Sequence, residues 1–307
     1  MIKHALAVLL ALAFFGWFVA SGQWNAVGKA LVSISPSALL PAVLGFAASY
    51  LLRALRVWDE FRHDGKGRFG ACLRIVLIHN ALVNIVPFRA GEAAFPILIR
   101  RIFGTPLHRA LASLFWFRLQ DAFVVLALAI MLWPGLPTVL RLLGVASIVA
   151  VALTLPFWAR RRRGRHDGSR WRARFDLMRD AFAESASHAR FSWLWTIANW
   201  AVKLAAQAWL LSFLTAAGFA VGAAGALGAE LASILPVQGI AGFGTYEAGA
   251  AAAMLPFGID LEVGLRAALL VHLFAIALAC SAALLAWLSQ AVLTARTNNQ
   301  TPMGIGK

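Results

Sequence analysis

The sequence predicts an all-α polytopic membrane protein, and two features of its composition support that fold class. Apolar residues make up 61% of the 307-residue chain, whereas charged residues make up 13%, about half of their usual share of about 25% in soluble proteins. A soluble fold of this length cannot bury so much apolar surface. The apolar residues also gather in long runs, and about 20 such residues are enough to cross a bilayer as a helix.

The net charge of the chain is strongly positive, and in a membrane protein it does not indicate a nucleic-acid partner. The chain carries 28 Lys and Arg against 13 Asp and Glu, a net charge of +15. In a soluble protein this excess suggests nucleic acid, but in a membrane protein it indicates basic cytoplasmic loops first and anionic lipid second. We therefore expect no nucleic-acid partner. Cys72 and Cys280 form neither a metal-binding spacing nor a disulfide framework, so we expect no metal and no cofactor.

Six apolar runs are long enough to be full spans. The first also resembles a secretory signal peptide with a cleavage site near Ser21, but the spans that follow it favour a membrane helix. The predicted spans are residues 5–20, 38–55, 117–133, 137–158, 191–217 and 263–293.

Basic residues predict the orientation. Six Lys and Arg lie within residues 53–74 and ten arginines within residues 160–190, whereas residues 21–37 contain a single lysine. Cytoplasmic loops carry the excess of Lys and Arg. We therefore place the basic segments and both termini in the cytoplasm of a bacterial-type inner membrane.

Two further apolar stretches are interrupted by Pro, Gly and polar residues. With this orientation, residues 71–103 must leave the cytoplasmic side and return to it, and residues 218–257 must do the same from the outer side. Two broken helical hairpins that enter from opposite sides are typical of a loose inverted repeat. Hairpins that end within the membrane and hairpins that cross it give the same charge pattern.

The chain thus divides into four predicted parts around a basic centre. They are a first membrane half (residues 1–158, with hairpin 71–103), a basic cytoplasmic segment (159–190), a second membrane half (191–295, with hairpin 218–257) and a cytoplasmic tail (296–307).

The basic segment contains one apolar helical stripe. Trp171, Phe175, Met178 and Phe182 recur at spacings of four, three and four, with arginines around them. This pattern predicts an amphipathic helix on the anionic lipids of the inner leaflet. For residues 159–170 a solvated charged loop is the alternative.

Polar residues inside apolar segments mark the candidate site, because a charge within hydrocarbon costs about 2.5–3.5 kcal/mol on insertion scales. The first cluster lies at the tip of the first hairpin. Asn80 and Asn84 share a helix face, and Pro87 ends that helix. Arg89 and Glu92 follow where free backbone N–H groups suit an anion. We predict that Arg89 holds a lipid phosphate; the alternative is an Arg89–Glu92 pair that completes the turn.

Two more clusters lie inside predicted spans. Arg118 and Asp121 are three residues apart near the start of their span and face the same way. They fit an ion pair, a place in the site, or an Arg118 that extends to the inner surface. Lys203 and Gln207 are four residues apart and share a face, which predicts that they line the same cavity, unless Lys203 only pairs with an acid.

The last cluster is a Gly-rich turn in the second hairpin. Such a turn lets backbone approach a phosphate, but this one lacks the Lys and Ser or Thr of a P-loop, so we reject nucleotide binding. Its glutamates could carry a proton, hold a cation or pair with arginines of the first hairpin; neutral glutamates in a helix turn are the alternative. The candidate residues are Glu230, Gln238, Gly242, Gly244, Tyr246 and Glu247.

These motifs resemble the lysylphosphatidylglycerol synthase transmembrane-region family, the flippase-like membrane domain of the multiple peptide resistance factors. The resemblance rests on HNALVNIVPFRAGE, on the Arg118/Asp121 pair and on PVQGIAGFGTYE. It implies movement of lipids or lipid-linked headgroups between leaflets by a stand-alone member without the soluble synthase domain, since the chain ends at Lys307. The positions that carry over are Asn84, Pro87, Arg89, Gly91, Glu92, Arg118, Asp121, Gly242, Gly244 and Glu247.

We therefore expect a transporter, not an enzyme, that moves an anionic phospholipid or a lipid-linked phosphate between leaflets. Arg89, with Arg118 or Lys203, is expected to bind the phosphate, and rocking of the two halves to expose it to each leaflet. Two alternatives stay open. One is an integral-membrane lipid-modifying enzyme, although no metal-ligand cluster and no nucleophile beside a histidine is evident. The other is a non-catalytic scaffold that binds lipid-synthesis enzymes.

Overall fold

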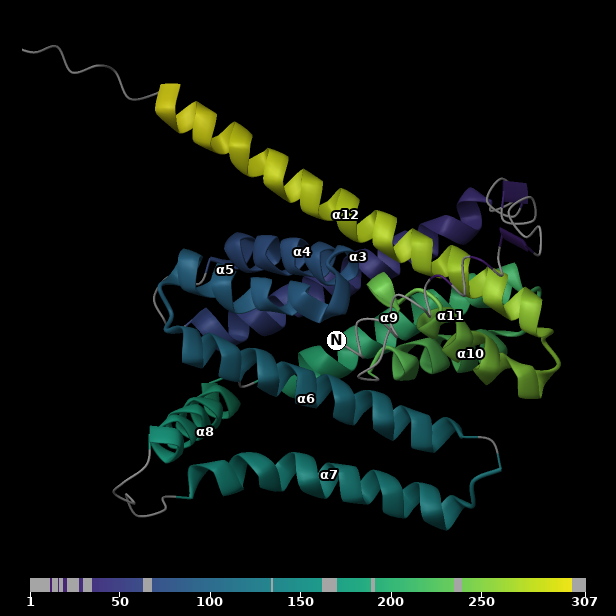
Figure 1. Cartoon of the computed structure of the whole chain (residues 1–307), viewed down its shortest axis with the longest axis horizontal. Coiled ribbons are helices and arrows are strands. Elements are labelled where there is room, and N and C mark those ends of the chain that lie inside the picture. The colour runs from purple at the N-terminus through teal and green to yellow at the C-terminus, as the bar shows by residue number, and fades with distance from the viewer. Residues whose placement is uncertain are drawn as a thin grey trace, which may run out of the picture.

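The computed structural model describes residues 35–62, 68–133, 135–161, 170–188, 191–234 and 239–299, with a few isolated positions before Ser35. Within these ranges the side chains of residues 87–89, 170–175, 188 and 292–299 are not described. The described chain folds into ten α-helices and three short 3₁₀ helices (Figure 1). This all-helical architecture confirms the predicted fold class.

Five of the described helices are long and apolar enough to cross a membrane. Each coincides with a predicted span, so the chain is a multi-pass membrane protein. The sixth prediction, residues 5–20, falls almost entirely outside the described residues. The five helices are α3 (Pro36–Phe61), α6 (Leu107–Leu132), α7 (Thr138–Arg160), α9 (Ser192–Leu214) and α12 (Leu261–Asn299).

Helix α6 begins earlier than the sequence pattern predicted. Pro106 stands at its N-cap and Leu107 is its first residue, whereas the predicted span starts ten residues later. The polar and basic residues in the first turns hid the beginning of this helix. Arg118 and Asp121 consequently lie near the middle of α6, not near its start. Their charges are therefore inside the bundle.

Both predicted broken hairpins are present as short helices. The bends η2 and η3 contact each other, so the two hairpins meet inside the bundle. The first hairpin consists of α4 (Phe69–Ile85), η2 (Pro87–Ala93) and α5 (Ala94–Phe103). The second consists of α10 (Phe219–Ala232), η3 (Ile240–Gly242) and α11 (Thr245–Met254), which η4 (Leu255–Phe257) joins to α12.

Proline and glycine cause these bends. Pro87 cannot donate a backbone hydrogen bond and therefore cannot continue α4. Gly91 lies so close to α4 that a Cβ atom there would overlap the backbone of Leu82. In the second hairpin Gly242 and Gly244 adopt φ of 86° and 83°, which residues with a side chain rarely adopt.

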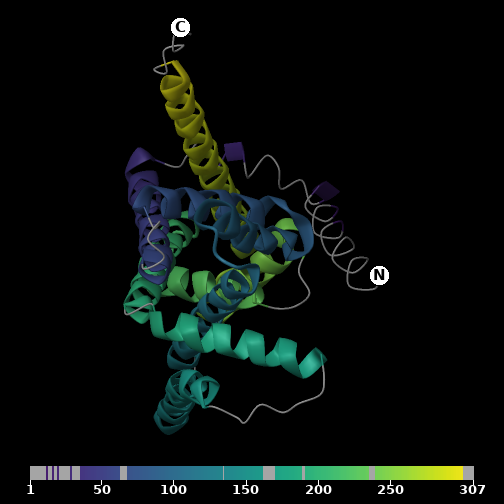
Figure 2. The same ribbon diagram turned by 90° about the vertical axis from the view of Figure 1, so that its left-hand side faces the viewer.

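Helix α12 is the longest of the described helices. Its 39 residues extend for about 58 Å at the usual rise per residue. It packs against α4 and α11, and its C-terminal part projects from the bundle (Figures 1 and 2). This helix therefore contacts both hairpins.

Helices α9, α10 and α11 pack through small residues, which permit close backbone approach in membranes. A Cβ atom at Gly222 would overlap the backbone of α9 at Ala208, and one at Gly228 would overlap the carbonyl of Gly249 in α11. The second hairpin is consequently a tight unit, and larger side chains at these positions would force it apart.

The substitution Gly228→Ala tests this packing. We expect it to destabilise the protein by about 1–3 kcal/mol, the usual effect of overpacking, because the added methyl group also lies 2.5 Å from Ala253 Cβ. The matched control is Gly70→Ala, since Gly70 has no atom within 4 Å of an added Cβ. A thermal unfolding midpoint that falls equally in both variants would contradict the packing account.

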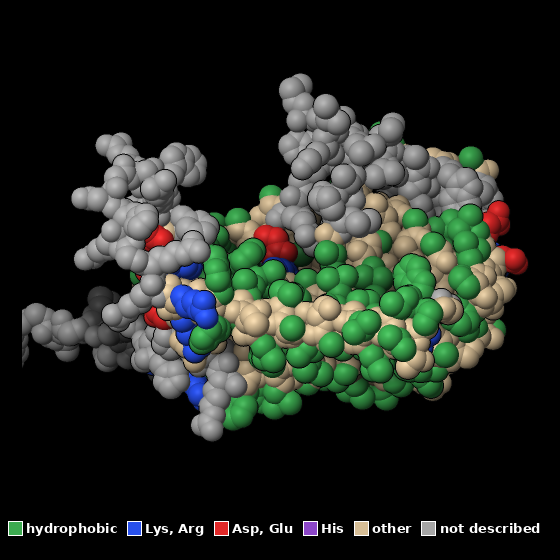
Figure 3. All heavy atoms as spheres, turned by 90° about the horizontal axis from the view of Figure 1, so that it is seen from below, with side chains coloured by type: hydrophobic (Ala, Val, Ile, Leu, Met, Phe, Trp, Pro, Cys, Tyr) green, Lys and Arg blue, Asp and Glu red, His purple; other side chains and the backbone are tan. Residues whose placement is uncertain are grey.

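Helices α7 and α8 (Arg170–His188) lie at the periphery and contact α6 and each other. Only 6% of the apolar window of α7 is buried, and hydrophobic side chains cover the face that Figure 3 shows, with Lys and Arg near one end.

The predicted lipid-facing stripe of α8 is wrong at Phe182, which is buried with its ring centroid 5.2 Å from that of Trp116. Met178 is exposed, and the side chains of Trp171 and Phe175 lie outside the described residues.

Candidate functional site

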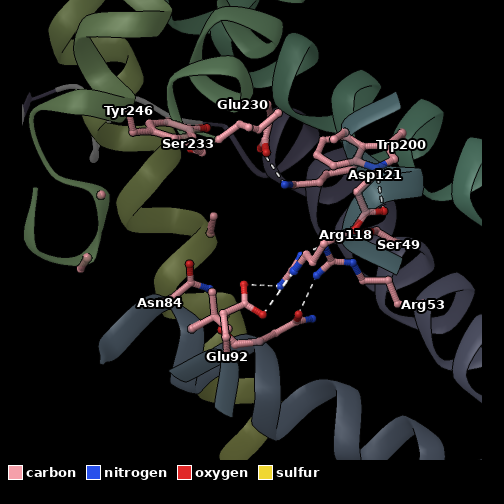
Figure 4. Close-up of a pocket in the computed structure, with 18 of the residues that line it drawn as sticks. Ser49, Arg53, Asn84, Glu92, Arg118, Asp121, Trp200, Glu230, Ser233 and Tyr246 are labelled. Atoms are coloured by element: carbon pink, nitrogen blue, oxygen red, sulfur yellow. Dashed lines mark hydrogen bonds and ion pairs between the residues drawn. The ribbon is translucent and has the colours of Figure 1, made fainter. Parts of the chain in front are cut away.

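One cavity of about 720 Å³ collects most of the polar side chains inside the bundle. Four long helices, α3, α6, α9 and α12, form its walls with α4, α10 and both hairpin bends (Figure 4). Its polar and charged lining residues are Ser49, Tyr50, Arg53, Asn80, Asn84, Glu92, Arg118, Asp121, Trp200, Lys203, Gln207, Glu230, Ser233, Tyr246 and His272.

The first charged pair joins the first hairpin to α6. Arg118 Nη2 lies 2.6 Å from Glu92 Oε1, and Arg118 Nε donates to Glu92 Oε2 at 3.2 Å. This two-pronged contact is the strong form of an Arg–carboxylate pair. Arg118 therefore does not extend to the membrane surface, and Glu92 pairs with α6.

Asp121 connects three helices. It accepts from Arg56 Nη1 of α3 at 2.8 Å and from Trp200 Nε1 of α9 at 3.1 Å, and its second oxygen lies 3.5 Å from Arg118 Nη1. Arg56 and Asp121 are 4% and 7% exposed. The contacts come from two cations and an indole N–H, so Asp121 fits its place as a carboxylate.

The second charged pair joins α9 to the second hairpin on the opposite wall (Figure 4). Lys203 Nζ lies 2.6 Å from Glu230 Oε1, and Gln207 Nε2 donates to the same oxygen at 2.8 Å and to Tyr246 Oη at 3.0 Å. Lys203 and Gln207 both line the cavity, and Lys203 also pairs with an acid, which was the alternative to a shared cavity face. The Lys203 ammonium also lies 4.7 Å from the ring of Trp200, within reach of a cation–π interaction.

Arg53 differs from the other cations of the cavity. Its Nη1 donates at 2.6 Å to the amide oxygen of Asn80, a neutral acceptor. Among the described residues, no carboxylate lies within ion-pair distance of Arg53, whereas Arg118 and Lys203 are both paired. Arg53 is therefore the lining guanidinium whose charge is least compensated.

Arg53 begins the basic stretch of residues 53–74, which the charge pattern places in the cytoplasm, so it was not predicted as a site residue. A signal was present: Ser49, Arg53 and Arg56 recur at spacings of four and three, so they share one face of an apolar helix. Trp200 and His272 also line the cavity, and neither was predicted as a site residue.

Glu247 lies behind the cavity wall and is fully buried. One of its oxygens accepts from the Gly244 backbone N–H at 2.7 Å, and the other lies 2.7 Å from His272 Nδ1. The ring of His272 stacks on that of Tyr246 with centroids 4.4 Å apart. Glu247 therefore caps its own helix and binds α12. The predicted option that it pairs with an arginine of the first hairpin centres on Arg89, whose side chain lies outside the described residues.

The cavity brings together nine of the predicted site residues. Gly244 and Glu247 are not among its lining residues. Gln238 and the side chain of Arg89 lie outside the described residues. The nine are Asn80, Asn84, Glu92, Arg118, Asp121, Lys203, Glu230, Gly242 and Tyr246.

Asn84 forms its hydrogen bond within α4 and not across the cavity. Its Nδ2 donates at 2.9 Å to the backbone oxygen of Asn80, one turn earlier in α4. In the described part of the chain, no group of three or more His, Cys, Asp and Glu side chains is arranged to hold a metal ion. The polar chemistry of the cavity is thus that of charge pairs, amides and one less compensated arginine.

These features define a class: a multi-pass membrane protein with a charged internal cavity between two broken helical hairpins. Residues 4–295 match the family described as the lysylphosphatidylglycerol synthase TM region, and the chain belongs to that family. The family is associated with lipid modification and lipid flipping. Among curated proteins, none matches the sequence.

Proposed function

We propose that the protein moves a phosphate-bearing lipid between the leaflets of a bacterial-type inner membrane, with both termini in the cytoplasm. The position of the cavity is the observation that carries this proposal. Charged side chains of both hairpins and of α3, α6 and α9 meet inside an apolar bundle. Such residues inside membrane segments usually mark a substrate pathway, and about 720 Å³ lies within the usual size range of small-molecule sites.

Arg53 is the proposed primary phosphate ligand. Because its donor contact is to a neutral amide, it can accept a phosphate without first losing a carboxylate partner. A guanidinium also matches phosphate oxygens in a two-pronged geometry. Arg89 stays a predicted second ligand from the bend η2, while Arg118 and Lys203 are tied to Glu92 and Glu230.

The contact between the two bends supports the proposed route of transport. Since η2 and η3 meet at the cavity, a rocking motion that separates them would open the cavity on one side and close it on the other. We propose that the two halves form a loose inverted repeat that moves in this way.

The substitution Arg53→Gln tests the proposal. Glutamine keeps a donor for Asn80 but removes the charge. We expect leaflet exchange of labelled anionic, zwitterionic and polyprenyl-phosphate lipids in proteoliposomes to fall about tenfold to a hundredfold for the transported lipid, the effect of losing one charge-assisted hydrogen bond. The thermal unfolding midpoint should stay close to that of the wild type.

The matched control is Arg100→Gln, because Arg100 is exposed on α5 and does not line the cavity. Equal transport by Arg53→Gln and wild type would remove Arg53 from the site. Absence of exchange by folded wild-type protein, with either direction of a pH gradient, would favour the alternatives. Product formed from a lipid would then indicate an enzyme, and stable co-purification of lipid-synthesis enzymes would indicate a scaffold.

A further inference from the structure

A second, smaller chamber lies beside the main cavity. Its volume of about 40 Å³ exceeds the 10–15 Å³ or so that one water requires, but it is far too small for a lipid headgroup. Helices α3, α4, α5 and α6 enclose it, and five of its lining residues also line the main cavity, four of them polar. These shared polar residues are Arg53, Asn80, Arg118 and Asp121.

Two buried side chains of this chamber have donors without acceptors. Arg56 donates through Nη1 to Asp121, but no acceptor among the described residues reaches its Nε or Nη2. The Asn80 oxygen accepts from Arg53, which turns its amide nitrogen Nδ2 the other way, and Nδ2 also has no described acceptor. Arg56 and Asn80 are 4% and 6% exposed, and buried donors of this kind are rarely left unmatched.

Among the described residues that line the chamber, His79 Nδ1 is the other unmatched polar atom, and it is a donor or an acceptor according to the tautomer of the ring. Arg56 Nε, Arg56 Nη2 and Asn80 Nδ2 can act only as donors. All three atoms therefore need an acceptor.

The charges around the chamber point the same way. Arg53, Arg56 and Arg118 face it, whereas Asp121 and the Glu92 that pairs with Arg118 supply two carboxylates. Three guanidiniums against two carboxylates leave one unit of positive charge, that of the half-buried Arg53, and a charge removed from water without a counterion is costly. A monovalent anion would neutralise it.

We propose that this chamber binds a halide ion, chloride under ordinary conditions, between the free edge of Arg56 and the amide nitrogen of Asn80. A halide accepts from several donors and supplies the missing charge. Water fits these partners less well, because it must also donate its own hydrogens and brings no charge. Apolar walls that include Phe95, Val57 and Phe117, whose ring lies 4.2 Å from Arg56 Cζ, exclude solvent and strengthen the attraction.

The proposed halide donors, Arg56 and Asn80, differ from the proposed phosphate ligand Arg53, whose surplus charge lies between the two spaces. The halide would hold α3 and α4 together through Arg56 and Asn80, whatever occupies the larger cavity. Its occupancy can therefore be measured from stability alone, with no lipid and no transport assay.

The test compares the thermal unfolding midpoint of the purified full-length protein in sodium chloride, sodium bromide and sodium gluconate at one fixed ionic strength. We expect a saturable rise with chloride and with bromide that gluconate does not produce, since a ligand that binds only the folded state stabilises it. Equal midpoints in all three salts would overturn the proposal.

The substitution Asn80→Asp gives the sharper result, because it replaces the amide donor of the halide with a carboxylate that repels the ion. We expect the halide response to disappear, or the halide concentration for half-effect to rise at least about tenfold. The matched control is Asn84→Asp, on the same helix, which lines only the larger cavity and should keep the response. An unchanged response in Asn80→Asp would contradict the assignment.

A direct readout covers the case in which a variant fails to fold. Wild-type crystals grown in bromide should show an anomalous scattering peak between Arg56 and Asn80. Density for water alone at that place, with no anomalous signal, would overturn the proposal.

Discussion

Replacing Asp121 with asparagine is expected to lower the free energy of unfolding by about 3–5 kcal/mol, the usual effect of removing one partner of a buried ion pair. Asp121 accepts from Arg56 at 2.8 Å and from Trp200 at 3.1 Å. Arg56 is 4% exposed, and among the described residues Asp121 is the carboxylate within ion-pair distance of it. Asparagine keeps the size of the side chain but leaves the guanidinium buried without its counterion.

Thermal or denaturant unfolding of the purified protein measures this effect. The matched control is Asp176→Asn on α8, where the carboxylate is 49% exposed and lies 3.6 Å from Arg179. An exposed pair of this kind contributes less than about 1 kcal/mol. If Asp121→Asn and Asp176→Asn were equally mild, Asp121 would not be the link between α3, α6 and α9.

A double variant separates charge from packing. Arg56→Met with Asp121→Leu removes both charges, and apolar replacement of a buried pair is often close to neutral. We expect this variant to recover most of the stability that Asp121→Asn loses. Failure to recover would mean that the polar contacts to Trp200 and Arg118, not the charge of Arg56, dominate the effect of Asp121.

The fold could be predicted from the sequence because each membrane span is a local run of apolar residues. The apolar runs predicted the five described long helices, and Pro87 and the glycines near residue 242 predicted the two broken hairpins. The start of α6 was missed because Arg109 and its polar neighbours interrupt the apolar run. Burial against other helices, which composition does not record, allows a helix to contain such residues.

The site was predictable only as sets of residues on one helix face. Helical spacing placed Asn80 with Asn84 and Lys203 with Gln207 correctly. It could not predict partners on other helices, because spacing within a helix says nothing of which helices are neighbours. Arg56 and Asp121 are 65 residues apart, and Glu247 and His272 are 25 apart.

The same reason explains why Arg53 was not selected. An arginine near the end of a span cannot be distinguished by composition from one in a cytoplasmic loop, so the positive-inside rule counts it as a loop residue. In the structure its neighbours are Asn80 and the cavity. The positive-inside rule therefore assigns an arginine near the end of a span to a loop, even when its side chain lines the internal cavity.

The pair Lys203–Glu230 gives the second large effect, and it distinguishes a structural role from a place in the lipid pathway. Glu230→Gln alone should destabilise the protein by about 3–5 kcal/mol, because Lys203 keeps its charge in a buried place without its counterion. The two side chains are 19% and 8% exposed. Unfolding of the purified variant measures this loss.

The double variant Lys203→Met with Glu230→Gln removes both charges, keeps the lysine stem as an apolar chain and leaves an amide for Gln207. We expect its stability to return to within about 1 kcal/mol of the wild type, while lipid exchange in proteoliposomes stays at the protein-free rate. Recovery of stability without recovery of exchange would place the pair among the groups that bind the lipid. Recovery of both stability and lipid exchange would assign the Lys203–Glu230 pair to packing and leave phosphate binding to the arginines. A charge that only stabilises the fold can be removed together with its partner, whereas a charge that binds a substrate cannot.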